Sequence, residues 1–127
     1  MFRIFLVEDS IPVRERVAAL LSSVEGVDTV GSAATAHDAE QAILAVRPDA
    51  VLLDIKLAQG TGFDVLRALR AQAPQIEIYM LSNFATPAYR HMAATLGAHG
   101  FFDKTTELEA MRRTMAERAA QPAQPIQ

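Results

Sequence analysis

The sequence predicts an α/β fold: a doubly wound, five-stranded parallel sheet with helices on both faces. Three observations predict it. Apolar runs of strand length alternate five times with stretches of helical periodicity along the 127 residues. The run over residues 50–53 is continuously apolar, which is typical of parallel strands buried on both faces. The length fits one domain, and half of the residues are hydrophobic, enough for a core without disulfides.

The first strand and helix are expected at the amino terminus. Residues 2–7 form an apolar run of strand length. Pro12 suits the first turn of a helix, because the amide hydrogen that it lacks has no partner there. Apolar residues then recur at near-helical spacing up to Val24, and residues 27–30 predict a short second strand.

Capping residues mark the next two helices. Thr35 lies three residues before Asp38, and this pattern predicts a helix that begins there and ends before Pro48. The apolar run 50–53 is the expected third strand. Residues 61–64, Thr-Gly-Phe-Asp, repeat the capping pattern and predict the start of a third helix.

Two further strand and helix pairs complete the pattern. Residues 76–81 predict the fourth strand. Thr86-Pro87 begins a fourth helix, and Gly97 ends it. Residues 100–102 predict a short fifth strand. The last helix is expected to begin with a cap over residues 106–109, where Thr106 would be the capping residue.

Composition and length narrow the class of protein. Residues 1–118 are expected to form one domain, and the Pro/Gln/Ala-rich residues 119–127 a disordered tail. The absence of cysteine excludes disulfides and thiolate metal sites and suits the cytoplasm. The apolar start is too short for a secretion signal, and no run reaches the roughly 20 residues of a membrane span. A net charge of −3 with scattered basic residues argues against nucleic-acid binding.

Charged and hydroxyl side chains stand where the predicted strands end. Glu8 and Asp9 follow the first strand, Asp54 the third, Ser82 the fourth, and Lys104 the fifth. In a 2-1-3-4-5 strand order, the first and third strands flank the point where the order reverses, and ligands bind there at the carboxyl edge. Any one of these acids could be a loop residue or a helix cap. Their occurrence together at matching strand ends favours a ligand-binding site. One lysine cannot offset three carboxylates, so a divalent cation such as Mg²⁺ is expected.

In their order and spacing, these motifs resemble those of receiver domains of response regulators in two-component signalling. The resemblance covers roughly residues 2–118 and implies a flavodoxin-like (βα)₅ fold. The matching residues are the acid pair Glu8-Asp9, the phosphoacceptor Asp54, the switch hydroxyl Ser82, the switch aromatic Phe101 and the lysine Lys104.

The resemblance implies that Asp54 accepts a phosphoryl group from a histidine kinase or a phosphotransfer protein. Mg²⁺ (or Mn²⁺) would be held by Asp9, Asp54 and the backbone carbonyl of Lys56, with Glu8 acting through a metal-bound water. Lys104 would pair with a phosphoryl oxygen, so that catalysis is positioning plus charge stabilisation. The chain would thus catalyse its own phosphorylation and dephosphorylation without being a classical enzyme.

Phosphorylation would then recruit the Ser82 hydroxyl and allow Phe101 to turn inward. The altered surface would comprise the fourth helix, the fifth strand and the fifth helix. Through it the chain would regulate a protein partner, whose identity the sequence leaves open, or form a phosphorylation-dependent dimer.

The chain departs from the family pattern at several positions. Glu8 stands where the family usually has aspartate, and Ala58 stands where a proline is common. Phe101 lacks the hydroxyl of the more usual tyrosine, so packing alone would choose between its positions. Lys56 and Phe84 are expected beside the attacking water, where they would tune the lifetime of the phosphoaspartate.

Three alternatives stay open. A phosphohydrolase with an aspartyl nucleophile would usually carry a second aspartate two residues later, where this chain has Lys56. A phosphorylation-independent adaptor with a vestigial pocket is disfavoured by the joint presence of the matching residues. Residues 119–127 could also begin a linker to a removed DNA-binding or enzymatic domain.

Overall fold

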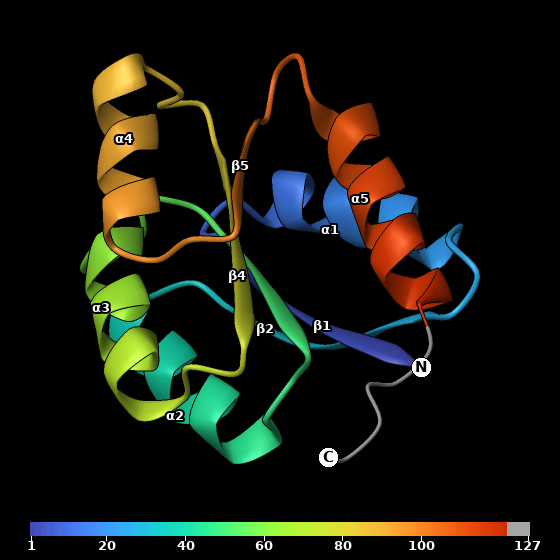
Figure 1. Cartoon of the computed structure of the whole chain (residues 1–127), viewed down its shortest axis with the longest axis horizontal. Coiled ribbons are helices and arrows are strands. Elements are labelled where there is room, and N and C mark those ends of the chain that lie inside the picture. The colour runs from blue at the N-terminus through green and yellow to red at the C-terminus, as the bar shows by residue number, and fades with distance from the viewer. Residues whose placement is uncertain (122–127) are drawn as a thin grey trace.

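The computed structural model describes residues 1–121 and contains one parallel sheet with the strand order β2-β1-β3-β4-β5 (Figure 1). The predicted fold class and strand order are therefore confirmed. The strands are β1 Phe2–Val7, β2 Val27–Ala33, β3 Ala50–Leu53, β4 Glu77–Ser82 and β5 Gly100–Asp103. The helices are α1 Ile11–Ser22, α2 Ala36–Val46, α3 Gly62–Gln72, α4 Pro87–Thr95 and α5 Leu108–Ala120. Within residues 1–121, none of these helices is long and apolar enough to cross a membrane.

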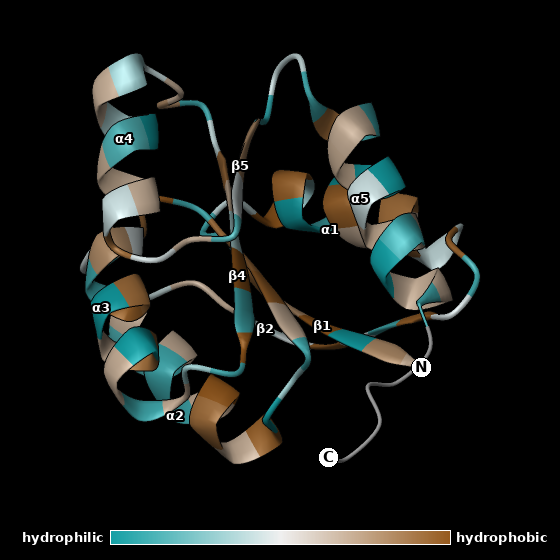
Figure 2. Cartoon of the chain, viewed as in Figure 1, coloured by the Kyte–Doolittle hydropathy of each residue, from teal (hydrophilic) through white to brown (hydrophobic). Residues whose placement is uncertain are grey.

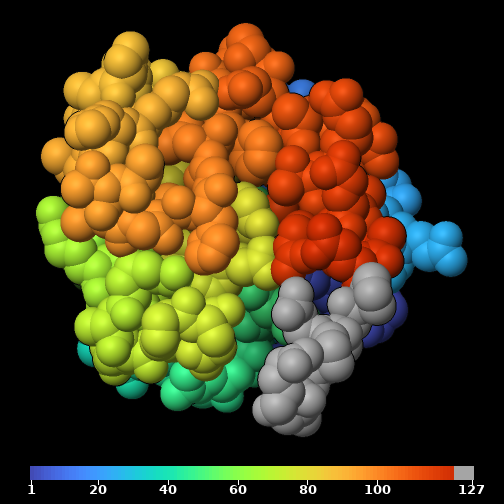
Figure 3. All heavy atoms as spheres, viewed as in Figure 1, coloured from blue at the N-terminus to red at the C-terminus, as the bar shows by residue number. Residues whose placement is uncertain are grey.

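Two hydrophobic clusters, one on each face of the sheet, form the core. Helices α2, α3 and α4 cover one face, and α1 and α5 cover the other (Figure 1). In Figure 2 the hydrophobic residues of α3, drawn in brown, face the sheet. Figure 3 shows α4, β5 and α5 together on the face turned to the viewer. Strand β3 is buried along its whole length, as its apolar sequence predicts.

Helix caps were predicted well where the capping contact is local. The hydroxyls of Thr35, Thr61 and Thr86 each accept a bond from the backbone amide three residues later. The expected cap at Thr106 is wrong: α5 begins at Leu108, and its N-cap residue Glu107 makes no side-chain capping bond. The Glu107 carboxylate instead accepts bonds from a neighbouring strand and helix.

The ends of β2 and α5 differ from the sequence-based expectation. Strand β2 continues to Ala33, because residues 31–33 pair with β1 after a bulge between Ile4 and Phe5. Helix α5 continues to Ala120, so the first two residues of the expected tail are helical. The rest of that expectation falls mainly on residues 122–127, which lie outside the described part of the chain.

The contacts of His99, the residue just before β5, predict that the stability of the folded domain depends on pH. Its Nδ1 accepts a bond from the Ile78 amide at 3.2 Å and must be unprotonated to do so. Desolvation, then the charges of Arg70 and Arg118, lower the pKa of His99, while Glu77 acts in the opposite direction. The unfolded chain, with a histidine pKa of about 6.5, therefore takes up protons first, and the folded state loses stability as the pH falls below that value.

The variant His99→Asn is expected to reduce this loss, because the asparagine side-chain oxygen can accept the same bond but does not titrate. Urea unfolding at pH values of about 5.5 and 7.5, on either side of the ordinary histidine pKa, measures the effect. An unchanged pH dependence in the variant would show that His99 is not the responsible group.

Candidate functional site

The predicted site residues meet at the carboxyl edge of the sheet. Strands β1 and β3 pair directly, with Val7 opposite Leu53, so the residues that follow them, Glu8 and Asp54, lie side by side. The Asp54 amide donates to the Val7 carbonyl at 3.0 Å. The prediction of one shared site requires the ends of the first and third strands to lie next to each other, and these pairings place them so.

Lys104 bridges two buried carboxylates. Its Nζ donates to Asp54 Oδ2 at 2.6 Å and also to Glu8 Oε1. The side chains of Lys104, Glu8 and Asp54 are at most 9% exposed. The backbone amide of Lys104 donates to the Ser82 carbonyl at 3.1 Å, which anchors the lysine to the end of β4. A single ammonium thus faces two carboxylates in a site that is largely shielded from water.

Burial and hydrogen bonds shift the pKa values of both Glu8 and Lys104. Burial raises the pKa of the Glu8 carboxyl above its ordinary value, and the bonds from Lys104 and the Ser10 amide offset only part of that effect. Burial also lowers the pKa of the Lys104 ammonium, but its bonds to Asp54 and Glu8 outweigh burial and raise the pKa overall. Lys104 is therefore charged at neutral pH, while the ionised form of Glu8 is costly.

Three carboxylates are arranged so that they could share a metal ion. Glu8, Asp9 and Asp54 each offer one oxygen, and the three oxygens lie within 4.8 Å of one another. Asp9 is exposed, whereas the other two residues are buried, so the cluster opens to solvent on one side. A ligand set of carboxylate oxygens alone fits Mg²⁺ or Mn²⁺. Lys56 lies exposed in the loop after β3, and the role of its carbonyl as a ligand stays a prediction.

Ser82 is fully buried, and its hydroxyl oxygen accepts a bond from the Phe84 amide at 3.0 Å. The Phe84 side chain is 40% exposed and lies 6.0 Å, between ring centroids, from Tyr89. Tyr89 in turn stacks on Phe63 at 6.0 Å. The loop after β4 therefore contacts both the Ser82 hydroxyl and the aromatic side chains of α3 and α4.

Three residues make contacts that the sequence did not predict. The Ser10 amide donates to Glu8 Oε2 at 3.0 Å. A Cβ atom on Gly62 would lie 2.0 Å from the Asp54 carbonyl oxygen, so this position accepts only glycine without a backbone shift. The Arg90 guanidinium lies 5.0 Å from the centroid of the Phe101 ring. The contacts of Gly62 and Arg90 join separate segments, and no local sequence pattern reveals them; the Ser10 contact is local, but it depends on the turn after β1.

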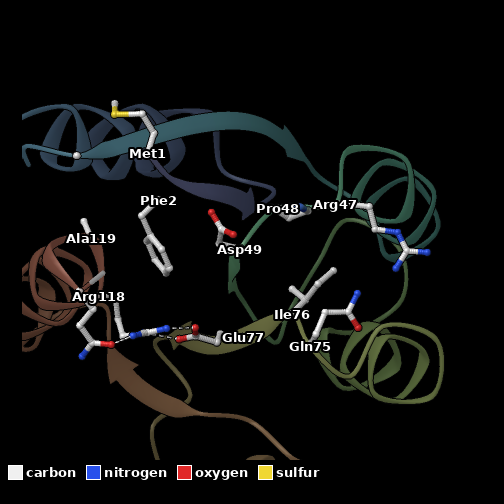
Figure 4. Close-up of a pocket in the computed structure, with 12 residues that line it drawn as sticks. Met1, Phe2, Arg47, Pro48, Asp49, Gln75, Ile76, Glu77, Arg118 and Ala119 are labelled. Atoms are coloured by element: carbon white, nitrogen blue, oxygen red, sulfur yellow. Dashed lines mark hydrogen bonds and ion pairs between the residues drawn. The ribbon is translucent and has the colours of Figure 1, made fainter. Parts of the chain in front are cut away.

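A hollow of about 530 Å³ lies at the opposite, amino edge of the sheet (Figure 4). Its wall includes Phe2, Asp49, Glu77 and Arg118. Arg118 pairs with Glu77 and lies over the Phe2 ring at 5.6 Å, as Figure 4 shows for the ion pair. The charges of this pair satisfy each other, and the hollow is separated by the length of β1 from the acidic cluster. It therefore adds nothing to the chemistry of the carboxyl edge.

Comparison with known proteins agrees with the geometry of the carboxyl edge. A family model described as the response regulator receiver domain matches residues 4–116. The chain is also similar to the structure of the BeF₃-activated N-terminal receiver domain of Klebsiella pneumoniae RstA. That match has 29% identity and a TM-score of 0.83, and it covers 94% of this chain and 99% of that chain.

Longer proteins also match. The chain is 30% identical over 109 residues to the uncharacterized transcriptional regulatory protein YvfU of Bacillus subtilis, covering 86% of this chain and 54% of that protein. It is 32% identical over 120 residues to a protein-glutamate methylesterase/protein-glutamine glutaminase of a Nocardioides species, covering 91% of this chain and 32% of that protein. The chain thus spans about half, or a third, of the length of these relatives.

Proposed function

The chain belongs to the receiver-domain family of two-component response regulators, a family of phosphorylation-controlled signalling domains, and we propose that Asp54 is its phosphoacceptor. The observation that carries this proposal is the bridge from Lys104 to Asp54 and Glu8, beside the exposed carboxylate of Asp9. The bridge places a cation against the proposed acceptor at the point where negative charge would accumulate during transfer.

In the proposed reaction, an Asp54 oxygen attacks the phosphorus of a phosphohistidine on a kinase or phosphotransfer protein. The new O–P bond forms as the P–N bond breaks, and the histidine leaves with the electron pair. The Asp54 carboxylate is held in place by two bonds, from the Ile55 amide to Oδ1 at 2.7 Å and from Lys104 to Oδ2. Lys104 is then positioned to pair with a phosphoryl oxygen.

The metal ligands proposed are Asp9, Asp54 and the Lys56 carbonyl, with Glu8 acting through a water. Bound Mg²⁺ or Mn²⁺ supplies positive charge that offsets the phosphoryl oxygens. The carboxylate cluster supports this assignment, because its net negative charge exceeds what Lys104 can offset.

The proposed output is a change at the surface formed by α4, β5 and α5 that regulates a protein partner or supports a dimer. The relatives named as a transcriptional regulatory protein and as a methylesterase are longer than this chain, which supports a second possibility. The receiver domain could act on an output domain in the same polypeptide. In either case we place it with its kinase in the cytoplasm, which suits a chain without cysteine.

Intact-mass measurement after incubation with acetyl phosphate and Mg²⁺ tests the proposal. We expect one added phosphoryl group on the wild type, and none in Asp54→Asn or after chelation of the metal. Asp38→Asn, which removes an exposed carboxylate on α2, is the matched control and should be phosphorylated normally. A wild type that stays unmodified with several donors would favour the vestigial adaptor, and phosphorylation of Asp54→Asn would move the acceptor elsewhere.

Phe84 and Lys56 are proposed to tune the lifetime of the phosphoaspartate. Phe84→Ala is expected to speed dephosphorylation by about threefold, roughly 0.7 kcal/mol in barrier, because we expect this exposed ring, two residues after Ser82, to shield the phosphoryl group from water. Lys56→Ala is expected to slow it by a similar factor, because a nearby positive charge favours attack on the phosphoryl group. Decay of the phosphorylated mass after removal of the donor measures both rates. Arg67→Ala, an exposed change on α3, serves as control, and unchanged rates in both variants would refute the idea.

A further inference from the structure

Arg90 on α4 joins four segments of the chain. Its Nε donates to the Ala85 carbonyl, in the loop after β4, at 3.1 Å. Its Nη1 donates to the Phe101 carbonyl in β5 at 3.4 Å, and its Nη2 donates to Glu107 Oε1, just before α5, at 2.7 Å. The guanidinium also lies over the Phe101 ring, with 5.0 Å between its central carbon and the ring centroid.

Glu107 extends this set of contacts to the end of β5. The same Oε1 atom that accepts the bond from Arg90 also accepts one from the Asp103 amide at 2.9 Å. Arg112 offers a contrast, since it pairs with Glu109 only three residues away on α5. That pair lies within one helix and so joins no separate segments. Arg90, in contrast, connects α4, β5 and the start of α5.

Phe101 lies on the same face of the sheet as Ser82. Phe101 is opposite Met80 in the β4–β5 pairing, and side chains two residues apart on a strand share a face, so Ser82 also points to the side covered by α4. Ser82 is fully buried, but the Phe101 ring is only partly buried. The Arg90 side chain that covers the ring is 39% exposed. The ring therefore packs partly against the core cluster that contains Met80 and has the partly exposed Arg90 guanidinium over it, whereas the hydroxyl is enclosed.

We propose that Arg90 is a positioning residue that holds the resting state of the domain by keeping Phe101 in this partly buried position. An inward turn of the ring, which the proposed function requires, must break the contact between the ring and the guanidinium. The same turn loosens the connection between α4 and α5 on the face that Figure 3 shows. This inference rests on the proposed function and assigns to one side chain the bias between the two states.

Titration with beryllofluoride, a phosphoryl mimic, in the presence of Mg²⁺ tests this inference. Calorimetry gives the half-saturating concentration, and amide NMR shifts of β5 report the conformational change. Because Arg90→Ala removes a ring contact that we propose is made only in the resting state, it is expected to lower the half-saturating concentration by about tenfold. Arg90→Lys, which keeps the charge near Glu107 but cannot lie flat on the ring, should give an intermediate value.

Two controls separate positioning from a general structural role. Arg112→Ala, which removes a partly exposed arginine that pairs with Glu109 within α5, should leave the titration unchanged. In a Phe101→Leu background, Arg90→Ala should lose most of its effect, because the ring it restrains is absent.

The outcomes also distinguish this inference from the proposed function. A wild type that does not bind beryllofluoride would overturn the proposed function and this inference with it. Normal binding by the wild type, with unchanged or weaker binding by both Arg90→Ala and Arg90→Lys, would overturn the role of Arg90 alone. Thermal unfolding of each variant confirms that it is folded before titration.

Discussion

Replacing Lys104 with methionine is expected to lower the free energy of unfolding of the metal-free protein by about 3 kcal/mol and to prevent phosphorylation. Methionine keeps most of the side-chain volume, so the loss comes from charge. Glu8 and Asp54 would be left buried and unpaired, with side chains only 9% and 7% exposed. Phosphorylation should fail because no ammonium remains to pair with the phosphoryl oxygen.

Urea unfolding in the presence of a chelator measures the change in stability, and intact mass after incubation with acetyl phosphate measures the activity. Adding Mg²⁺ should restore part of the lost stability, since a divalent cation can take over the charge of the ammonium. Lys56→Met is the matched control for the stability measurement, because this lysine is exposed and close in sequence to Asp54. Equal stability of Lys104→Met and wild type in chelator would mean that the bridge contributes nothing to folding.

The substitution Gly62→Ala is expected to destabilise the domain by about 3 kcal/mol and to displace Asp54. The added Cβ would lie 2.0 Å from the Asp54 carbonyl oxygen and 2.9 Å from its carbonyl carbon. Both are backbone atoms, so no rotamer change can relieve the clash. The Gly62 amide also donates to the Ile55 carbonyl at 2.7 Å, and a shift of this segment would weaken that bond.

Gly100→Ala is a suitable comparison for Gly62→Ala. Its new Cβ would meet the Tyr79 ring at 3.0 Å, and a side chain can move by a few tenths of an ångström at lower cost. Chemical unfolding of the two variants, with phosphorylation of each, should show a larger loss for Gly62→Ala in both measurements. Alanine normally favours a helix over glycine by about 1 kcal/mol, so a Gly62→Ala protein as stable as the wild type would show that the backbone near Asp54 shifts freely.

Local signals in the sequence were sufficient for most of the secondary structure. Thr35, Thr61 and Thr86 cap helices through contacts with the third residue that follows, and these contacts need no distant partner. The same reasoning failed at Thr106. There, Glu107 is engaged by Arg90 and by the Asp103 amide, and the helix begins without a side-chain cap. A capping pattern therefore predicts the start of a helix reliably only where no tertiary contact engages the residues of that pattern.

The sequence by itself determined the order of the strands and helices along the chain and the charged and hydroxyl residues at the ends of β1, β3, β4 and β5, because hydrophobic periodicity and capping act within a few residues of the chain. Only the tertiary structure decided which cation faces which acid. Lys104 is bonded to Asp54 and Glu8 across 50 and 96 residues of sequence. The need for glycine at position 62 and the contact of Arg90 with Phe101 likewise depend on the close approach of separate segments. These contacts follow from the packing of the whole sheet and its helices, so patterns within a few residues of the sequence cannot predict them.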